Sequence, residues 1–252
     1  MNKIALITGA TAGIGKATAL KLAKNNYDVI ITGRRKNLLN DLKNLIKERT
    51  KANVISLNFD IRNKDEVEKN IDSLPENWKK IDILINNAGL ALGLNPIYSG
   101  DVDDWETMID TNVKGLLYIS RKIMPIMIAQ GYGHIVNLCS IAGKEVYPNG
   151  NIYCATKHAV DAITKAMRID LNDFGIKVTS ISPGMVETEF SKVRFKGNNE
   201  KSDAAYQNFI PLQAEDIAES ILFAVKCPKH MNIADMLILP TAQANSSIIN
   251  KK

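Results

Sequence analysis

The sequence has few cysteines and no long apolar run. Its three cysteines, Cys139, Cys154 and Cys227, show neither the spacing of a disulfide framework nor that of a metal site. No apolar run approaches the roughly 18 residues that a membrane-spanning helix needs, and the apolar segment at residues 4–7 is too short for a signal peptide. We therefore expect a cytoplasmic protein whose thiols stay reduced and which has no membrane partner.

Histidine and net charge are also sparse. His134, His158 and His230 have no acid–base or metal-ligating constellation around them in the sequence, so we expect no metal, no Ser-His-Asp arrangement, and histidines that are structural or exposed. The 32 basic and 27 acidic residues leave a net charge of +5 that is spread along the chain. A nucleic-acid partner is therefore not expected.

Length and pattern predict one α/β domain over residues 1–252. Hydrophobic residues make up 45% of the chain, and no Pro-, Gly- or Ser-rich linker divides it. The expected strands are residues 4–8, 28–32, 54–58, 81–85, 133–138, 176–181 and 236–239. The expected helices are residues 16–24, 36–49, 64–72, 103–130 with a kink or restart near Pro125, 152–174 and 214–225. A polar lid is expected at about 185–209, and the tail at 241–252 has no strong pattern.

Glycines follow the first strand and precede the first helix. Gly9, Gly13 and Gly15 stand in the spacing Gly-x-x-x-Gly-x-Gly. Glycine allows a tight turn and a close approach of the backbone to a pyrophosphate, whose charge the helix N-terminus stabilises. The order strand, glycine turn, helix therefore predicts a dinucleotide site rather than an ordinary turn.

A basic turn follows the second strand. Arg34 and Arg35 come close to the roughly 20-residue spacing from the glycine turn at which dinucleotide-binding folds read the adenosine ribose. An acidic residue there binds a free 2′-hydroxyl, whereas arginine accommodates a 2′-phosphate. No acidic residue stands between Asp28 and Asp41. The turn therefore favours NADP over NAD.

Polar residues follow four further strands. The carboxyl ends of parallel strands meet at one edge of the sheet, where open α/β folds bind ligands. The residues at these ends are Asp60, which we expect to reach the adenine edge, Asn86-Asn87-Ala88-Gly89, Ser140, and Pro183-Gly184.

Tyr153 and Lys157 stand four residues apart in a predicted helix. This spacing places their side chains on one helix face. A neighbouring positive charge favours the phenolate and lowers the tyrosine pKa from its free value of about 10. We therefore expect Lys157 to lower the pKa of Tyr153, which could then exchange protons with an alcohol or a carbonyl.

Taken together, these motifs resemble the short-chain dehydrogenase/reductase superfamily over nearly the whole chain. The motifs are Thr8-Gly9-Ala10-Thr11-Ala12-Gly13-Ile14-Gly15, Asn86-Asn87-Ala88-Gly89, Asn112, Ser140, Tyr153, Lys157 and Pro183-Gly184. The resemblance implies a Rossmann-type doubly wound parallel sheet of seven strands with helices on both faces. It also gives a reason for a polar Asn112 in the middle of a helix.

The resemblance implies roles for individual residues. Tyr153 would be the acid/base, Lys157 would lower its pKa and hold the nicotinamide ribose, Ser140 would orient the substrate oxygen, and Asn112 would help to hold a water that connects Lys157 to solvent. Cofactor contacts are expected from Gly9, Thr11, Gly13, Ile14, Gly15, Arg34, Arg35, Asp60, Ile61, Asn87, Ala88, Gly89, Tyr153, Lys157, Pro183, Gly184, Val186 and Thr188.

Within that superfamily, the chain resembles the NADP-dependent 3-hydroxy acid dehydrogenases. The resemblance lies in Arg34-Arg35 and in residues 90–93, 104–112 and 188–197. It implies a small 3-hydroxy acid as substrate, such as serine, L-allo-threonine or a 3-hydroxypropionate-like acid, and a homotetramer.

The carboxylate of such a substrate needs a cation, because burying it unpaired would cost several kcal/mol. If the lid segment is extended, Lys192, Arg194 and Lys196 point to one side. We expect Arg194 to bind the carboxylate, since its planar fork matches the two oxygens and Val193 and Phe195 could shield it from water. A solvated basic loop is the alternative, more so for the lysines than for Arg194.

Two other functions remain open at this point. A 3-oxoacyl-carrier-protein reductase would share the fold, the Asn112, Ser140, Tyr153 and Lys157 set and NADP. A non-catalytic NADP(H)-sensing protein would bind the cofactor without turnover, but it need not retain a catalytic tyrosine.

Overall fold

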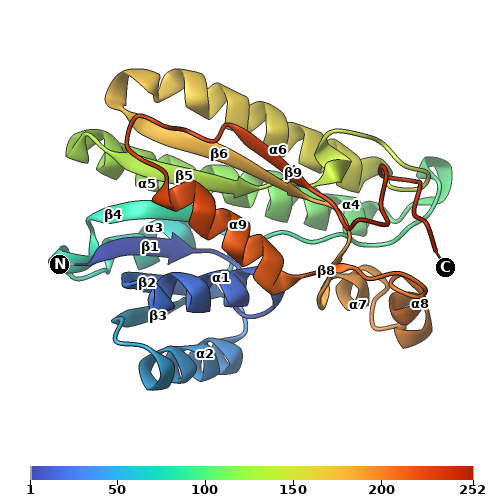
Figure 1. The fold of residues 1–252 in the computed structure, drawn as a ribbon, viewed down its shortest axis with the longest axis horizontal. Helices are drawn as coiled ribbons and strands as arrows, with labels where there is room; N and C mark the ends of the chain where they lie inside the picture. The colour runs from blue at the N-terminus through green and yellow to red at the C-terminus, as the bar shows by residue number, and fades with distance from the viewer. Residues whose placement is uncertain (1, 252) are drawn as a thin grey trace.

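A parallel seven-stranded sheet forms the centre of the molecule (Figure 1). The computed structural model describes residues 2–251. The strand order is β3-β2-β1-β4-β5-β6-β9, and every neighbouring pair is parallel. The strands are β1 Lys3–Ile7, β2 Tyr27–Gly33, β3 Val54–Asn58, β4 Ile81–Asn86, β5 Gly133–Leu138, β6 Ile176–Pro183 and β9 Asp235–Ile238. The predicted fold class is confirmed.

Helices cover both faces of this sheet, because its strands are apolar on both sides. On one face, α1 Gly13–Lys24, α2 Lys36–Arg49 and α9 Ala214–Lys226 share a core cluster with β1 and β2. On the other face, α3 Lys64–Asp72, α5 Leu116–Gln130 and α6 Asn151–Asp170 form a second cluster with β4 and β5. In α2, Leu39, Leu42 and Ile46 recur at helical spacing and are almost fully buried.

The order of the strands places the cleft. β1 pairs with β2 on one side and with β4 on the other, so the direction of chain progression reverses between β1 and β4. A crevice forms outside the carboxyl ends of the strands at such a switch point. The loops after β1, β2, β4, β5 and β6, which carry the predicted motifs, all lie at this edge.

The predicted restart near Pro125 is wrong, and a kink there stays a prediction. α5 runs through Pro125, which lies on its exposed side. The regular α-helix is instead interrupted earlier, where a π-helical segment, Asp110–Gly115, joins α4 Val102–Ile109 to α5. Asn112 sits in this wider segment and is buried, so the irregularity coincides with a tertiary contact and not with proline.

The segment predicted as a lid lies beside the carboxyl edge of the sheet (Figure 1). It contains β7 Val186–Glu187, α7 Phe190–Arg194 and α8 Asn199–Ala204, and β7 pairs with β8 Leu212–Gln213 in a small separate sheet. The expectation that the residues around Arg194 are extended is wrong, because α7 is helical there.

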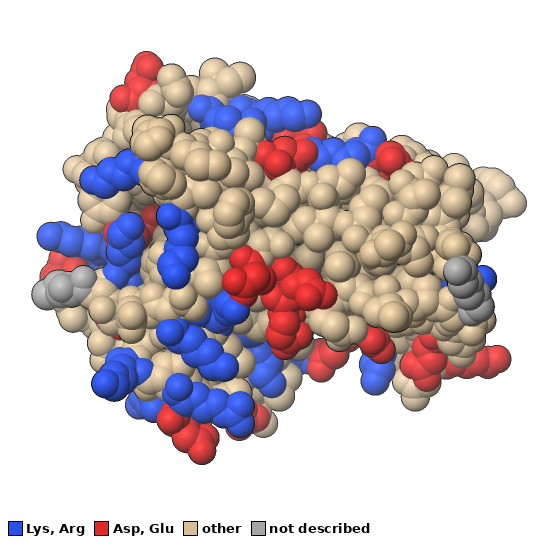
Figure 2. All heavy atoms as spheres, in the orientation of Figure 1, with Lys and Arg blue, Asp and Glu red and all other residues tan. Residues whose placement is uncertain are grey.

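Charged side chains gather in distinct areas of the face drawn in Figure 2. Basic side chains lie over α1 and α2, and acidic side chains lie over α9. Lys21 on α1 pairs with Glu219 on α9, so the two areas meet where these helices pack together.

The histidines are structural or exposed, as predicted. His134 lies 2.7 Å from the Thr179 hydroxyl, and burial lowers its pKa to about 3, so it stays neutral. His158 is exposed, and Cys139 and Cys154 are buried free thiols. Among residues 2–251 there is no helix long and apolar enough to cross a membrane, and no cluster of residues that could hold a metal ion.

Candidate active site

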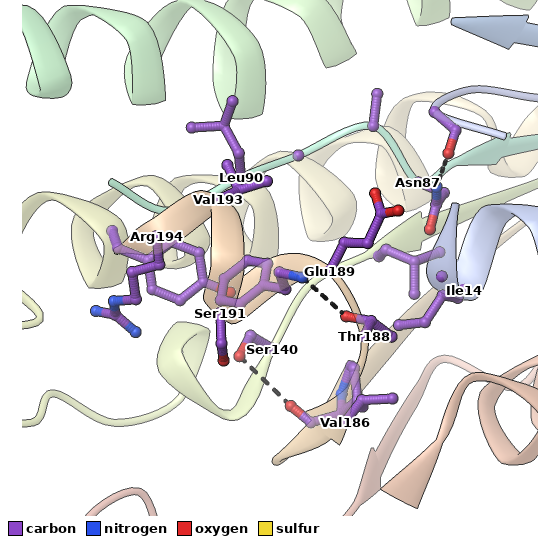
Figure 3. Close-up of a pocket in the computed structure, with 18 of the residues that line it drawn as sticks. Ile14, Asn87, Leu90, Ser140, Val186, Thr188, Glu189, Ser191, Val193 and Arg194 are labelled. Carbon is purple, nitrogen blue, oxygen red and sulfur yellow. Dashed lines mark hydrogen bonds between the residues drawn. The ribbon is translucent and has the colours of Figure 1, made fainter. Parts of the chain in front are cut away.

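A cavity of about 610 Å³ opens at the carboxyl edge of the sheet. Of the residues predicted to bind cofactor or substrate or to act in catalysis, those that line it are Gly9, Thr11, Gly13, Ile14, Arg34, Arg35, Asp60, Ile61, Asn87, Ala88, Gly89, Ser140, Tyr153, Lys157, Pro183, Gly184, Val186, Thr188 and Arg194. Gly15 and Asn112 lie behind this surface. Figure 3 shows Arg194 at one end of the cavity and Ile14 and Asn87 at the other, with Ser140 and Thr188 between them.

The glycine loop is packed so closely that side chains would not fit. Gly9 has a φ of +65°, and a Cβ on Gly15 would lie 2.4 Å from Asn87 Nδ2 and 2.5 Å from Gly9 O. Asn87 Nδ2 donates to Thr8 O at 2.8 Å, which ties the loop after β4 to the loop after β1. The bare backbone and the start of α1 thus form a cradle that suits a pyrophosphate.

The two arginines of the basic turn are exposed at the nucleotide end of the cavity. Arg34 Nη1 lies 3.8 Å from Asp60 Oδ2. Arg35 donates to Thr11 Oγ1 and, at 2.8 Å, to Glu189 Oε2. Because both guanidinium groups are solvent-accessible and border the cavity, they fit a 2′-phosphate.

Tyr153, Lys157 and Ser140 meet near the middle of the cavity. Tyr153 and Lys157 are 8% and 6% exposed, and Lys157 Nζ lies 6.0 Å from the centroid of the tyrosine ring. Lys157 donates to Leu138 O at 2.8 Å. Ser140 Oγ accepts from Ala142 N at 3.1 Å and donates to Pro183 O at 3.4 Å, so its position is fixed by backbone groups on both sides.

The pKa of Tyr153 is raised in this structure, and not lowered as expected from the neighbouring Lys157. Burial raises the pKa of Tyr153, and Tyr147 adds to the rise, while the Ser140 hydroxyl and the Arg194 guanidinium lower that pKa and offset part of the effect. Burial also lowers the pKa of Lys157. Desolvation therefore dominates over the charges that surround the phenol.

Asn112 holds the loop that follows β4. Its Oδ1 accepts from Leu90 N and its Nδ2 donates to Leu90 O, both at 2.8 Å, and Nδ2 also donates to Thr156 Oγ1 at 3.0 Å. A Cβ on Gly89 would lie 3.2 Å from Asn112 Oδ1 and 3.6 Å from Lys157 Nζ. The asparagine thus fixes the loop against α6, and its predicted role in holding a water stays a prediction.

Two residues of α7 cover Tyr153. The Phe190 ring packs edge-on against the Tyr153 ring, with centroids 5.6 Å apart. The Arg194 guanidinium carbon lies 5.5 Å from the Tyr153 centroid and 5.4 Å from that of Tyr147. Arg194 Nε donates to Gly93 O at 3.2 Å, and Gly93 N donates to Arg194 O at 3.0 Å.

The other two cations of this segment point elsewhere. Lys196 pairs with Asp101 and Asp104, and Lys192 is exposed and does not line the cavity. The expectation that Val193 shields Arg194 from water is wrong, because the Val193 side chain is itself 42% exposed. Tyrosine rings shield Arg194 instead, since helical α7 turns it inward.

Several cavity residues carry no signal in the sequence. Tyr147 lies in the irregular loop before α6, and Phe190 is one of several apolar residues scattered through a largely polar lid. The tail folds back so that Gln243 Oε1 accepts from Met185 N at 2.9 Å. Ser246 N donates to a Glu145 carboxylate oxygen at 2.8 Å. Gln243 and Ser246 thus line the cavity from a segment that has no periodicity.

Comparison with known proteins agrees with this geometry. A family model described as short chain dehydrogenase matches residues 3–199. The NADP-dependent 3-hydroxy acid dehydrogenase YdfG of Salmonella typhi is 45% identical over 96% of both chains. Sulfoacetaldehyde reductase 2 of Chromohalobacter salexigens is 43% identical over 98% of both. Among solved structures, the closed form of serine dehydrogenase complexed with NADP+ has a TM-score of 0.92 and 43% identity, covering 96% of this chain and 97% of the other. The chain belongs to the short-chain dehydrogenase family.

Proposed function

We propose that this protein is an NADP-dependent oxidoreductase that interconverts the 3-hydroxyl and 3-oxo forms of a small 3-hydroxy acid. The observation that carries the proposal is the Arg194 guanidinium, which lies over the ring of the buried Tyr153 at one end of the cavity. A proton-transferring phenol and a cation that could bind a carboxylate are thus next to each other. The similarity to proteins named as 3-hydroxy acid and serine dehydrogenases supports the same substrate class.

The nucleotide end of the cavity would hold NADP. The glycine cradle would bind the pyrophosphate, Arg34 and Arg35 the 2′-phosphate, and Asp60 and Ile61 the adenine. Pro183, Gly184, Val186 and Thr188 would contact the nicotinamide, and Lys157 would bind its ribose. When bound, the cofactor accepts or supplies the hydride.

Tyr153 carries the proton. In oxidation its Oη takes the proton of the substrate hydroxyl, and in reduction it returns that proton to the carbonyl oxygen. Ser140 Oγ orients the same oxygen, from a position fixed by Ala142 N and Pro183 O. Phe190 and Arg194 exclude water from the phenol, which strengthens these electrostatic interactions.

The pH dependence follows from the raised pKa of Tyr153. At neutral pH the phenol is protonated, so the acid form needed for reduction is abundant and the base form needed for oxidation is scarce. The kcat/KM of oxidation should therefore rise steadily with pH between about pH 6 and 10, the latter being the reference pKa of tyrosine. A flat profile, measured with the hydride-transfer step rate-limiting, would remove the phenolate mechanism.

Arg194 binds the substrate carboxylate. Among the described residues, no acidic side chain forms an ion pair with it, although it is half-buried. Its contacts are instead Gly93 O and two tyrosine rings. The Tyr147 hydroxyl could add a second hydrogen bond to the same anion. A relative named for sulfoacetaldehyde, which also carries an anionic group, is compatible with this arrangement.

Arg34→Ala should weaken binding of NADP(H) much more than that of NAD(H), because only the former carries the 2′-phosphate. A charge-assisted hydrogen bond contributes about 1.5–3 kcal/mol, which corresponds to roughly a tenfold to hundredfold change in Kd. Titration of both cofactors into the variant measures the difference. Equal losses for the two would make the basic turn a solvated surface and would contradict the NADP assignment.

The carrier-protein alternative predicts a different substrate. A 3-oxoacyl thioester has no free carboxylate, so it would leave Arg194 without a partner in the cavity. The change in NADPH absorbance with L-serine, L-allo-threonine and 3-hydroxypropionate, compared with 3-oxoacyl thioesters, separates the two. Turnover of the thioesters alone would favour the reductase, and tight NADP binding with no turnover of either class would favour a sensor.

We also propose that residues 185–209 act as a lid over the cavity.

We further propose that four chains associate in the cytoplasm. The outer face of α6 is compatible with a contact between chains, because Ile169 there is 77% exposed. Light scattering on the purified protein measures the number of chains.

A further inference from the structure

An ion pair connects the start of α7 to the basic turn across the mouth of the cavity. Arg35 Nη1 lies 2.8 Å from Glu189 Oε2, and both side chains are about half exposed. Glu189 is the N-cap residue of α7 and directly precedes Phe190, whose ring packs on Tyr153. Figure 3 shows the Glu189 side chain extending beside the cavity between Thr188 and Asn87.

Three of the five N–H donors of the Arg35 guanidinium are already engaged. Nε and Nη2 donate to Thr11 Oγ1 at 3.2 and 2.9 Å, and Nη1 donates to the Glu189 carboxylate. An anion that binds at this turn competes with these contacts for the position and the charge of the guanidinium. The contact with Glu189 joins two opposite charges, whereas Thr11 is neutral, so Glu189 is the main competitor for Arg35.

The Glu189 carboxylate also places a negative charge beside the proposed site for the 2′-phosphate. Arg34 faces a second carboxylate, that of Asp60, but Asp60 is held in a fork by Arg62 Nε and Nη2. Glu189 has no such second cation among the described residues, and Arg35 is its one ion-pair partner there. A 2′-phosphate that takes Arg35 leaves this carboxylate unpaired and close by.

We infer that Glu189 is a specificity-determining residue for the nucleotide, because it competes with the 2′-phosphate for Arg35. The inference rests on the proposed NADP function. The competition falls only on a nucleotide that carries the 2′-phosphate, so Glu189 lowers the affinity for NADP and leaves that for NAD unchanged. Glu189, a residue of the lid, therefore reduces the preference for NADP over NAD that Arg34 and Arg35 would otherwise provide.

Glu187 offers a matched control. It lies two residues earlier on β7, is exposed, and accepts from Gln213 Nε2 at 3.2 Å. It does not line the cavity. Replacing either glutamate by glutamine removes the same charge from the same short segment, so a difference between the two variants reports the contact with Arg35 and not the net charge of the lid.

The test is calorimetric titration of adenosine 2′,5′-bisphosphate and of 5′-AMP into the parent, Glu189→Gln and Glu187→Gln proteins. We expect Glu189→Gln to tighten binding of the bisphosphate about two- to fivefold at low salt, the range of an exposed ion pair. The gain should shrink in high salt, where exposed charges are screened. Binding of 5′-AMP by Glu189→Gln, and of both nucleotides by Glu187→Gln, should stay at the parent value.

Arg35→Ala, alone and combined with Glu189→Gln, separates the possible failures. We expect Arg35→Ala to weaken bisphosphate binding and to remove most of the gain from Glu189→Gln. Unchanged or weaker binding by Glu189→Gln, with a clear loss in Arg35→Ala, would overturn the inference and leave the NADP assignment standing. If neither Arg34→Ala nor Arg35→Ala weakened binding of the bisphosphate, the 2′-phosphate assignment itself would be overturned, and the inference with it.

Discussion

Tyr153→Phe should lower kcat by about 10²–10⁴-fold, the usual contribution of general acid–base catalysis, and leave NADP affinity almost unchanged. The substitution removes only the hydroxyl that carries the proton. The ring remains, and with it the packing against Phe190 and the face that Arg194 covers. The kcat is measured from NADPH absorbance, and the cofactor Kd from titration of the same preparation.

Tyr98→Phe is a suitable control for this variant. Tyr98 is 88% exposed and does not line the cavity, so its variant should match the parent protein. If Tyr153→Phe retained most of the parent kcat, another group would have to carry the proton, and the mechanism argued from the cavity would be wrong.

Arg194→Met should raise KM for 3-hydroxy acids by about tenfold to a hundredfold, corresponding to the loss of a charge-assisted hydrogen bond of roughly 1.5–3 kcal/mol. Rates with uncharged alcohols should remain similar, because they do not use the guanidinium. Methionine keeps much of the apolar stem that packs on the two tyrosine rings. Initial rates over a range of acid and alcohol concentrations measure both effects.

Lys192→Met provides the matched control, since Lys192 lies in the same helix but is exposed and outside the cavity. Its KM values should equal those of the parent. Arg194→Lys should restore acid binding only in part, because an ammonium does not match a carboxylate with two parallel hydrogen bonds. Unaltered KM for acids in Arg194→Met would sink the carboxylate assignment and favour the carrier-protein alternative.

The sheet and most of the cavity could be predicted because their signals are local. Apolar runs of strand length end at polar or glycine residues, so β3 and β5 begin and end where the pattern predicts. The four-residue spacing of Tyr153 and Lys157 fixes their common helix face. Since parallel strands all end at one edge, the motifs after them had to meet there.

What could not be predicted depends on tertiary contacts. Asn112 lies in a π-helical segment where its amide meets the Leu90 backbone, a contact between residues far apart in sequence. Arg194 reaches Tyr153 from a helix of only five residues, which is too short for a periodic pattern to predict. The pKa of Tyr153 depends on how deeply the ring is buried, and spacing along a helix does not give that quantity.

The most direct test of the central claim is the fate of deuterium at C3 of the substrate. L-Serine, L-allo-threonine and 3-hydroxypropionate deuterated at C3 are incubated with the protein and NADP, and the NADPH formed is analysed by mass spectrometry. The proposed reaction transfers the hydride from C3 to the nicotinamide, so NADPH from at least one of these acids should carry one deuterium. NADPH without deuterium, or no reduction of NADP by any of the three acids, would contradict the proposal that a small 3-hydroxy acid is oxidised at C3.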